Sequence, residues 1–294
     1  MNQIDQPGLP GIATDLSKES FTRFADFITE ELGIKMPESK LTMVQSRLLR
    51  RVRDLGLESI ERYAEYFFAI SNREEREHFI NAITTNKTDF FREPEHFTYL
   101  VESVLPELAR RPARDRTQFR AWSAGCSSGE EPYTLAMILA EYASVRPGFD
   151  FAILATDVST KMLHLARSGI YQESQILPVP PELRRKYLLR SRNNPHGLAR
   201  VVSKLRSRVS FHQLNFMDAS YAVKGIFDVV FFRNVMIYFD RNTQQAVVNK
   251  ICENLEPGGY LFAGHSESLS GLNVPLEAVK ASIYRKWTPR KAAG

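Results

Sequence analysis

The sequence predicts an α/β protein in which a mostly parallel, buried sheet is preceded by a small all-helical domain. Three observations support this fold class. Apolar residues recur at helical spacing up to about residue 85. After about residue 118, short apolar runs alternate with helical stretches, a pattern typical of parallel strands covered on both faces. The chain has 294 residues, 43% of them hydrophobic, so it can bury a full core without disulfides or metals.

The first part of the chain divides into a tail and a helical domain. Residues 1–15 are rich in Pro and Gly, so we expect a flexible tail. Residues 16–86 form the predicted helical domain. The apolar positions that mark its helices are Phe21, Phe24, Phe27 and Ile28, then residues 41–55, then Tyr63, Tyr66, Phe67 and Ile70. Gly33 and Gly56 punctuate them.

The second predicted domain spans residues 87–294. It begins with a helix, because Pro94 suits a first helical position and apolar residues recur through Leu108. Five apolar runs then predict strands, namely FRAWSAG, FAILATD, VSFHQLN, FDVVFFRN and GGYLFAGH, with the helix EEPYTLAMILAEYA between the first two. Ligands of such sheets bind beyond the carboxyl ends of the strands, so the residues at those ends are candidates for a site.

A basic segment interrupts this alternation at about residues 177–210, which we interpret as an inserted β-subdomain. It has a Pro-rich entry, a short helical stretch and a Val201-Val202 run that predicts a strand. Residues 177–213 carry nine basic and one acidic side chain, a net charge of +8, whereas the whole chain carries +5. The positive charge is therefore local, which weakens a general argument for nucleic-acid binding.

The first predicted strand ends in a loop of small residues, 124–129, that opens directly into Glu130 and Glu131 at a helix start. Such a loop lets a ligand approach the backbone closely. It lacks the G-x-G-x-x-G pattern, and two carboxylates at the helix start disfavour a pyrophosphate and favour a ligand that bears positive charge. An equally simple interpretation is a tight turn whose carboxylates suit the helix dipole.

Polar residues also follow the next strands. Asp157 ends the second run and could accept both hydroxyls of a ribose, although it could equally cap the following helix, as could Ser159. Asn215 follows the third run, and Arg233 and Asn234 follow the fourth. An Arg and an Asn at the end of a buried strand indicate a site or a buried polar network.

Four segments in this order and spacing, NAITTNKTDFFRE, WSAGCSSGEEPY, FFRNVMIYFD and LEPGGYLFAGHSES, resemble the CheR-type chemotaxis receptor methyltransferases. The resemblance covers nearly all of residues 21–284. It implies a Rossmann-like S-adenosylmethionine-dependent methyltransferase domain with a small inserted β-subdomain, preceded by an all-helical N-terminal domain. It also implies methyl transfer from S-adenosylmethionine to glutamate carboxylates of bacterial chemoreceptors, with S-adenosylhomocysteine as the product.

The resemblance implies roles for the residues at matching positions. Cofactor contacts are implied for Asn86, Thr88, Arg92, Glu131, Asp157, Asn215, Phe216, Arg233 and Asn234. Glu131 would meet the methionyl amino group and Asp157 the ribose. Arg92 and Tyr238 would lie nearest the methyl group and the incoming carboxylate, and they are the predicted catalytic residues. A glutamate with a pKa near ~4.3 arrives ionised, so no general base is required.

Two basic clusters are predicted to dock the receptor. The first lies on the helix of residues 41–55 and consists of Arg47, Arg50, Arg51 and Arg53. In the resembled family this helix faces the acidic methylation helices of the cytoplasmic receptor domain, although a basic helical face is often only solvated. The second lies in the insertion, which in the family can bind a peptide at the receptor C-terminus, and consists of Arg200, Lys204 and Arg206.

Other site classes are disfavoured. Cys126 and Cys252 lie far apart without metal-ligand spacing, so we expect no metal site. The GHSE segment at residues 264–267 lacks the nucleophile elbow of a hydrolase. The chain shows neither a leader pattern nor an apolar stretch of ~20 residues, so we expect a cytoplasmic monomer that does not insert into membranes.

The sequence leaves two alternative functions open. A nucleic-acid methyltransferase would share the cofactor and the fold, but the Asn/Asp-Pro-Pro-aromatic signature of the amino-directed DNA enzymes is replaced here by RNVMIYFD. A methyltransferase-like module could instead bind S-adenosylmethionine or a partner without turnover. The presence of Arg92, Glu131, Asp157, Asn215 and Tyr238 argues against that module.

Overall fold

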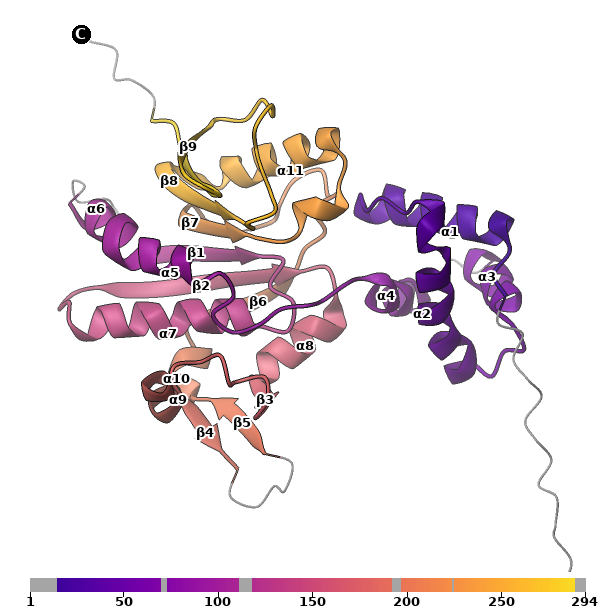
Figure 1. Ribbon diagram of the computed structural model, residues 1–294, viewed down its shortest axis with the longest axis horizontal. Coiled ribbons are helices and arrows are strands. Elements are labelled where there is room, and N and C mark those ends of the chain that lie inside the picture. The colour runs from indigo at the N-terminus through magenta and orange to yellow at the C-terminus, as the bar shows by residue number, and fades with distance from the viewer. Residues whose placement is uncertain (1–14, 70–72, 111–117, 192–196, 224, 289–294) are drawn as a thin grey trace, which may run out of the picture. The chain divides into compact units, whose positions relative to one another are not determined.

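The computed structural model describes residues 15–69, 73–110, 118–191, 197–223 and 225–288 (Figure 1). Most of the predicted tail, residues 1–14, and Ile70 lie outside this set. The chain forms two compact units, residues 1–85 and 86–294.

The first unit is helical. Its elements are α1 (Lys18–Leu32), the 3-10 turn η1 (Glu38–Lys40), α2 (Leu41–Asp54), α3 (Ile60–Ala69) and α4 (Arg73–Ile83). Phe24 is fully buried and packs its ring against Tyr63, Phe67 and Phe79, which come from α3 and α4. The apolar spacing predicted α1, α2 and α3, but it did not delimit α4.

The second unit contains a seven-stranded sheet of order β6-β2-β1-β7-β8-β10-β9. The strands are β1 (Gln118–Ala124), β2 (Asp150–Asp157), β6 (Val209–Gln213), β7 (Phe227–Phe232), β8 (Leu255–Ala263), β9 (Leu276–Lys280) and β10 (Ile283–Lys286). The first five are the strands that the apolar runs predicted, and they pair in parallel. β9 and β10, which were not predicted, complete the sheet as antiparallel strands.

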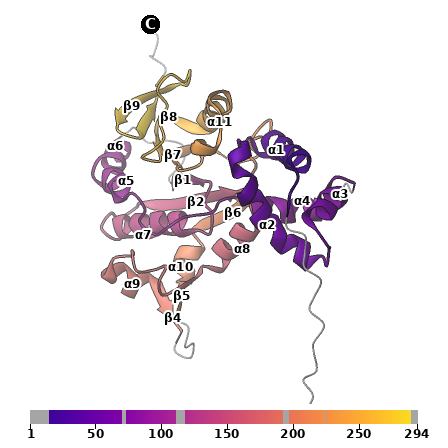
Figure 2. The ribbon, with the colours of Figure 1, turned by 45° about the vertical axis from the view of Figure 1, so that its right-hand side comes forward.

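Helices flank this sheet (Figure 2). α7 (Glu130–Ser144) and α8 (Thr160–Ser168) pack on β2 and β6, and α11 (Arg241–Glu253) packs on β8. The predicted helix from Pro94 is a continuous run of α5 (Pro94–Tyr99), a π-helical turn η2 (Leu100–Val104) and α6 (Leu105–Ala109). The arrangement confirms the predicted α/β class with a buried, mostly parallel sheet.

The insertion has its own small sheet. Strands β3 (Ile170–Gln172), β5 (Leu198–Val201) and β4 (Leu188–Arg190) pair antiparallel in that order, with helices α9 (Pro181–Tyr187) and α10 (Ser203–Arg206) beside them. β3 precedes residue 177, so the small sheet starts earlier than the predicted boundary. β3 has only three residues, which are too few to show an apolar pattern in the sequence. The strand is recognised only from its pairing with β5, in which Ile170 lies opposite Arg200.

Within the described ranges, none of the helices combines the length and the apolar content needed to cross a membrane.

Candidate functional site

The loop after β1 requires glycine at two places. Gly125 has a φ of 86°, and a Cβ there would lie 2.6 Å from Cγ2 of Val235. Gly129 has a φ of 99° at the start of α7, and a Cβ there would lie 2.9 Å from the Cβ of Ala166. The backbone amides of Gly125 and Cys126 donate to the carbonyl of Thr156 on β2. The loop is therefore held closely against its neighbours, as the small residues predicted.

Asp157 at the end of β2 supports this loop. Its Oδ2 accepts a hydrogen bond from the amide of Ser127 at 2.8 Å, and its Oδ1 accepts from the amide of Ser159 at 2.9 Å. Ser159, not Asp157, is the N-cap of α8, because its hydroxyl accepts from the amide of Met162. The side chain of Asp157 is buried, and burial raises the pKa of this carboxyl against the opposing effect of the backbone donors.

Glu131 and Arg233 form a buried ion pair next to the loop. Nη1 of Arg233 lies 3.2 Å from Oε2 of Glu131, and the hydroxyl of Ser123 donates to Oε1 at 2.7 Å. Burial raises the pKa of Glu131, while the charge of Arg233 opposes that rise. Glu130 points elsewhere: it accepts from the hydroxyl of Ser128, and burial raises its pKa. Of the two acidic residues, only Glu131 belongs to the network around Arg233.

Glu93 is a second partner of Arg233, and the sequence did not reveal it. Nη2 of Arg233 donates to Oε2 of Glu93 at 3.0 Å and also to the backbone carbonyl of Arg92. Oε1 of Glu93 accepts from Nδ2 of Asn234 at 3.3 Å. Burial opposes ionisation of Glu93, but the charge of Arg233 and the donors outweigh it, so its pKa lies below the ordinary value.

The backbone around Glu93 is unusual. Phe91 and Glu93 have φ values of 55° and 56°, in the left-handed region that residues with a Cβ rarely adopt. The amide of Phe91 donates to the hydroxyl of Thr134 on α7 at 3.1 Å. Such backbone conformations persist where surrounding contacts determine them, and they cluster at functional sites. The contacts of Phe91 and Glu93 therefore fix the path of residues 91–93.

Asn86 joins the rest of the predicted cofactor segment to the same loop. The hydroxyl of Ser127 donates to the carbonyl of Asn86 at 2.9 Å, and Nη1 of Arg92 donates to the carbonyl of Lys87 at 3.1 Å. Thr88 lies between these anchors and is half-buried. The structure thus joins Asn86 to the loop after β1, and the roles of Asn86, Thr88 and Arg92 in cofactor binding stay a prediction.

Glu267 is another buried acid that the sequence did not single out. Its Oε2 accepts from the amides of Asn234 and Gly264 at 2.8 Å and 2.6 Å, and its Oε1 accepts from the amide of Ile237. Asn234 has a φ of 59°, so this turn after β7 also needs tertiary support. Burial raises the pKa of Glu267 against these donors. The sequence signal that could have identified Glu267 is its place in the GHSE segment, shortly after the apolar run that predicts β8.

The remaining predicted residues lie around the ends of β6 and β7. Oδ1 of Asn215 accepts from the amide of Met217 at 3.0 Å. Phe216 is buried and packs edge-on against Phe232, close to the loop at Gly125. Tyr238 ends the 3-10 turn η3 (Met236–Tyr238) and is half-buried. Among the described residues, its hydroxyl has no hydrogen-bond partner.

The predicted docking cluster on α2 divides into two kinds of residue. Arg51 makes a bidentate pair with Glu75 at 3.0 Å and 2.6 Å, and Arg47 donates to the carbonyl of Ile83 and to Thr85. Arg51 thus holds α2 to the first turn of α4, and Arg47 holds it to the last residue of α4 and to Thr85. Arg50 and Arg53 are exposed. Tertiary contacts therefore engage the guanidinium groups of Arg47 and Arg51, and the docking role of the cluster stays a prediction.

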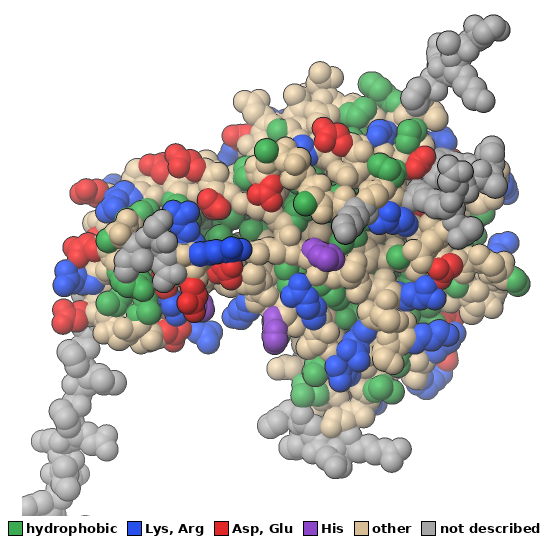
Figure 3. All heavy atoms as spheres, turned by 180° about the vertical axis from the view of Figure 1, so that it is seen from behind, with side chains coloured by type: hydrophobic (Ala, Val, Ile, Leu, Met, Phe, Trp, Pro, Cys, Tyr) green, Lys and Arg blue, Asp and Glu red, His purple; other side chains and the backbone are tan. Residues whose placement is uncertain are grey.

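The second basic cluster lies on the insertion. Lys and Arg side chains gather over this subdomain in the lower part of Figure 3. Arg200 and Lys204 are exposed, although Nε of Arg200 donates to the carbonyl of Ser168. Arg206 is half-buried, donates to the carbonyl of Val201 and packs close to Gly169. Arg206 therefore has a structural role in addition to its charge.

Comparison with known proteins agrees with this architecture. Residues 86–285 match the family described as CheR methyltransferase, SAM binding domain, and residues 19–84 match its all-alpha domain. The chemotaxis protein methyltransferase of Salmonella typhimurium is 41% identical over 257 residues, which cover 87% of this chain and 86% of that protein. The Escherichia coli protein of the same description is 40% identical over 269 residues, covering 92% and 91%. The one from Borreliella burgdorferi is 36% identical over 274 residues, covering 92% and 95%.

These matches confirm the resemblance seen in the sequence and the Rossmann-like class of the second unit. They also confirm the cofactor, since the matched domain is the one that binds S-adenosylmethionine. The two-unit chain, with its helical first unit and its glycine-dependent loop after β1, therefore belongs to the CheR methyltransferase family.

Proposed function

We propose that this protein transfers a methyl group from S-adenosylmethionine to glutamate side chains of bacterial chemoreceptors and so forms glutamyl methyl esters. A role in chemotaxis follows from the relatives, which are chemotaxis protein methyltransferases. The observation that carries the finer proposal is the bonding of Glu93 to both Arg233 and Asn234. It ties the segment that carries Arg92 to the turn after β7 that leads to Tyr238, which supports placing the two predicted catalytic residues at one site.

The residues at the strand ends fit the cofactor. The carboxylate of Asp157 accepts from backbone amides, among them those of Ser127 and Ser159, and an ionised carboxylate has about four lone-pair sites, so it can also accept from a ribose hydroxyl. Glu131 is an acid at a helix start, which suits an ammonium group and not a phosphate. We further propose contacts from Asn86, Thr88, Asn215 and Phe216. Bound S-adenosylmethionine supplies an electrophilic methyl group on a positively charged sulfonium.

Arg233 has a different role in this proposal. Its side chain is 2% exposed, and its guanidinium is bonded to Glu93, Glu131 and the carbonyl of Arg92. It also lies over the rings of Phe97 and Phe231. We therefore assign Arg233 as a positioning residue, which orients Glu131 and the Arg92 segment.

The acceptor carboxylate must be aligned with the methyl group, but it needs no general base. A receptor glutamate with a pKa near ~4.3 is already ionised at neutral pH. The guanidinium of Arg92, a half-buried residue, and the Tyr238 hydroxyl can each donate to one carboxylate oxygen and leave the other free to attack the methyl group. Holding reactants in line can contribute about 7–11 kcal/mol in favourable cases.

We propose that the receptor docks on the exposed basic residues. Arg50 and Arg53 on α2 are suited to the acidic methylation helices, and Arg200 and Lys204 of the insertion are suited to an acidic C-terminal peptide. Since those receptor segments are cytoplasmic, the protein would act in the cytoplasm, and we propose that it acts there as a monomer.

A labelling experiment tests this function. Methyl-labelled S-adenosylmethionine is offered to receptor-containing membranes and, separately, to nucleic acid. We expect label in the receptor that mild base releases as methanol, because carboxyl methyl esters are base-labile. Base-stable label in nucleic acid supports the alternative methyltransferase. Cofactor binding without any transfer supports the non-catalytic module.

A further inference from the structure

The buried carboxylate of Glu267 collects backbone amides from the turn after β7 and from the end of β8. Its Oε2 accepts from the amides of Asn234 and Gly264 at 2.8 Å and 2.6 Å, and its Oε1 accepts from the amide of Ile237 at 3.3 Å. The amide of Met236 also favours the ionised carboxylate and so opposes the rise in pKa that burial causes. Glu267 is 6% exposed, so its carboxylate takes the place of water as the partner of these amides.

Most of these amides belong to the turn that joins β7 to α11 and contains Tyr238. The 3-10 turn η3 has only three residues in this connection. Its own bonds run from the amide of Tyr238 to the carbonyl of Val235 at 3.2 Å and from the amide of Phe239 to the carbonyl of Met236 at 3.0 Å. Short 3-10 turns have poor hydrogen-bond geometry, so contacts from outside the turn have to define its path.

Gln244, in the first turn of α11, binds the opposite side of η3. Its Nε2 donates to the carbonyls of Met236 and Phe239 at 2.9 Å and 3.2 Å. Glu267 therefore holds amides of the turn, and Gln244 holds its carbonyls. Among the described residues the Tyr238 hydroxyl has no hydrogen-bond partner, so no bond of its own helps to place it.

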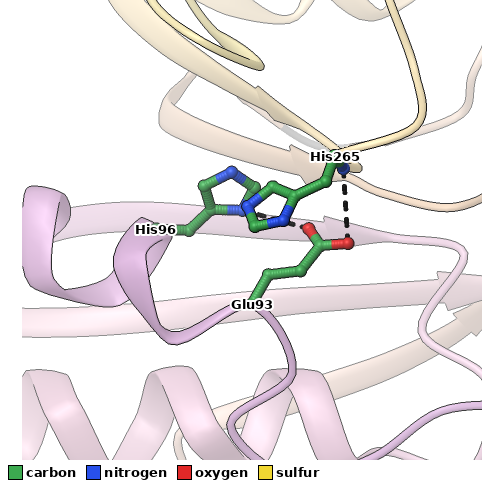
Figure 4. Close-up of side chains that lie close together, drawn as sticks. All are labelled: Glu93, His96 and His265. Carbon is green, nitrogen blue, oxygen red and sulfur yellow. Dashed lines mark hydrogen bonds and ion pairs between the residues drawn. The ribbon is translucent and has the colours of Figure 1, made fainter.

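The loop that carries Glu267 is itself fixed. The backbone amide of His265 donates to Oε1 of Glu93 at 3.3 Å, the bond drawn between these two residues in Figure 4. Gly264 leaves no room between the loop and the turn, since a Cβ there would lie 2.5 Å from Nδ2 of Asn234. Glu267 therefore acts on the turn from a defined position.

We propose that Glu267 is a positioning residue for methyl transfer, which holds the turn after β7 so that the Tyr238 hydroxyl meets the acceptor carboxylate. The role rests on the proposed function, in which Tyr238 contacts that acceptor. A carboxylate suits the role because both of its oxygens accept, whereas the carboxamide of a glutamine would present an N–H to some of the amides. Cofactor binding should depend less on Glu267, because Glu93 holds the side chain of Asn234 separately.

The substitution Glu267→Gln tests this role in the full-length protein. The kcat for receptor methylation should fall by at least about tenfold, because the acceptor loses its alignment. The affinity for S-adenosylhomocysteine should change by less than about threefold, since the Asn234 side chain keeps its bond to Glu93. Ser266→Ala, at an exposed neighbouring position, is the control and should behave like the wild type. An unchanged kcat, or a loss of affinity as large as the loss of kcat, contradicts the proposal.

A double substitution separates positioning of Tyr238 from a general structural effect. If Glu267 acts through Tyr238, Glu267→Gln should lower kcat by less than about twofold in a protein that already carries Tyr238→Phe. A merely structural role would lower kcat by the same factor in both backgrounds. Equal factors, or a Tyr238→Phe protein as active as the wild type, therefore overturn the proposal.

Hydrogen exchange tests the contact without any acceptor. In Glu267→Gln the amides of residues 234–238 should exchange at least about tenfold faster than in the wild type, while those of β1 should not change. Equal exchange of the turn in both proteins contradicts the proposal. A wild type that methylates no receptor would refute the proposed function, and the exchange of the turn would still decide whether Glu267 holds it.

Discussion

The guanidinium of Arg233 donates to the carboxylate of Glu93 at 3.0 Å, across 140 positions of the sequence. This contact joins the segment that carries Arg92 to the end of β7. Both groups are shielded from water, with side chains 2% and 12% exposed. Loss of one partner therefore leaves a buried charge without compensation.

Replacement of Glu93 tests the importance of this contact. Glu93→Gln should lower the free energy of unfolding by about 2–3 kcal/mol and reduce methyl transfer, because Arg233 then keeps only Glu131 as a charged partner. Urea unfolding and kcat measure the two effects. Glu95→Gln, at an exposed neighbouring carboxylate, is the control. Equal effects of both substitutions contradict the positioning role.

Tyr238→Phe tests the proposed contact with the acceptor carboxylate. The hydroxyl has no described partner within the protein, so its removal should leave stability and affinity for S-adenosylhomocysteine unchanged. The rate of receptor methylation should fall by about tenfold or more, since a donor to the carboxylate is lost. Tyr66→Phe in the helical unit serves as the comparison. Unchanged turnover in Tyr238→Phe removes this residue from the mechanism.

Tyr171 links the insertion to the loop after β1. Its buried hydroxyl donates to the carbonyl of Ser128 at 2.8 Å, and the same oxygen lies 2.8 Å from where a Cβ of Gly129 would be. Tyr171→Phe should weaken binding of S-adenosylhomocysteine about 5- to 10-fold, corresponding to about 1–1.4 kcal/mol. Calorimetry measures this affinity. Tyr187→Phe, which loses its bond to Glu141, should not change it.

The exposed arginines of α2 can be separated from the structural ones. The double substitution Arg50→Glu and Arg53→Glu should raise KM for the receptor and reduce its dependence on salt, because it removes charges that attract an acidic helix. Affinity for S-adenosylhomocysteine should not change. Arg73→Glu, at an exposed position of α4, is the control for a general charge effect. A KM equal to that of the control contradicts docking at Arg50 and Arg53.

The contacts of Glu61 predict that the stability of the helical unit depends on pH. It accepts from the amide of Ser17 and the hydroxyl of Ser20 at the start of α1. Burial opposes its ionisation, but these bonds and the charge of Arg23 outweigh burial and lower its pKa below the ordinary 4.5. Its contribution to stability is therefore present above about pH 4.5 and is lost as the pH falls through the lowered pKa.

The matching substitution is Glu61→Gln. It should lower the free energy of unfolding at pH 7 by about 1 kcal/mol, and the difference should vanish at acid pH, where the wild-type carboxyl is also neutral. Denaturant unfolding at several pH values measures it. Glu65→Gln, whose carboxylate pairs with Arg62 at the surface, should show little difference at any pH. A constant difference across the pH range contradicts the assignment.

The sequence by itself determined the strands β1, β2, β6, β7 and β8 and the positions of the residues that follow them. Apolar runs and small-residue loops are local signals, because burial on both faces of a parallel sheet requires them wherever the strand lies in the chain. The glycine-dependent loop at residues 125–129 directly follows β1 and Asp157 ends β2, so the sequence also located them.

Only the tertiary structure decided which polar groups meet. Glu93 and Glu267 have ordinary sequence surroundings, and their partners lie on other strand ends or loops. Likewise, nothing in the sequence distinguishes Arg51, which pairs with Glu75, from the exposed Arg50. A buried carboxylate or guanidinium is stable only with a partner, and that partner is chosen by the packing of distant segments. The sequence therefore determined the elements, and the packing of those elements decided the charge network of the site.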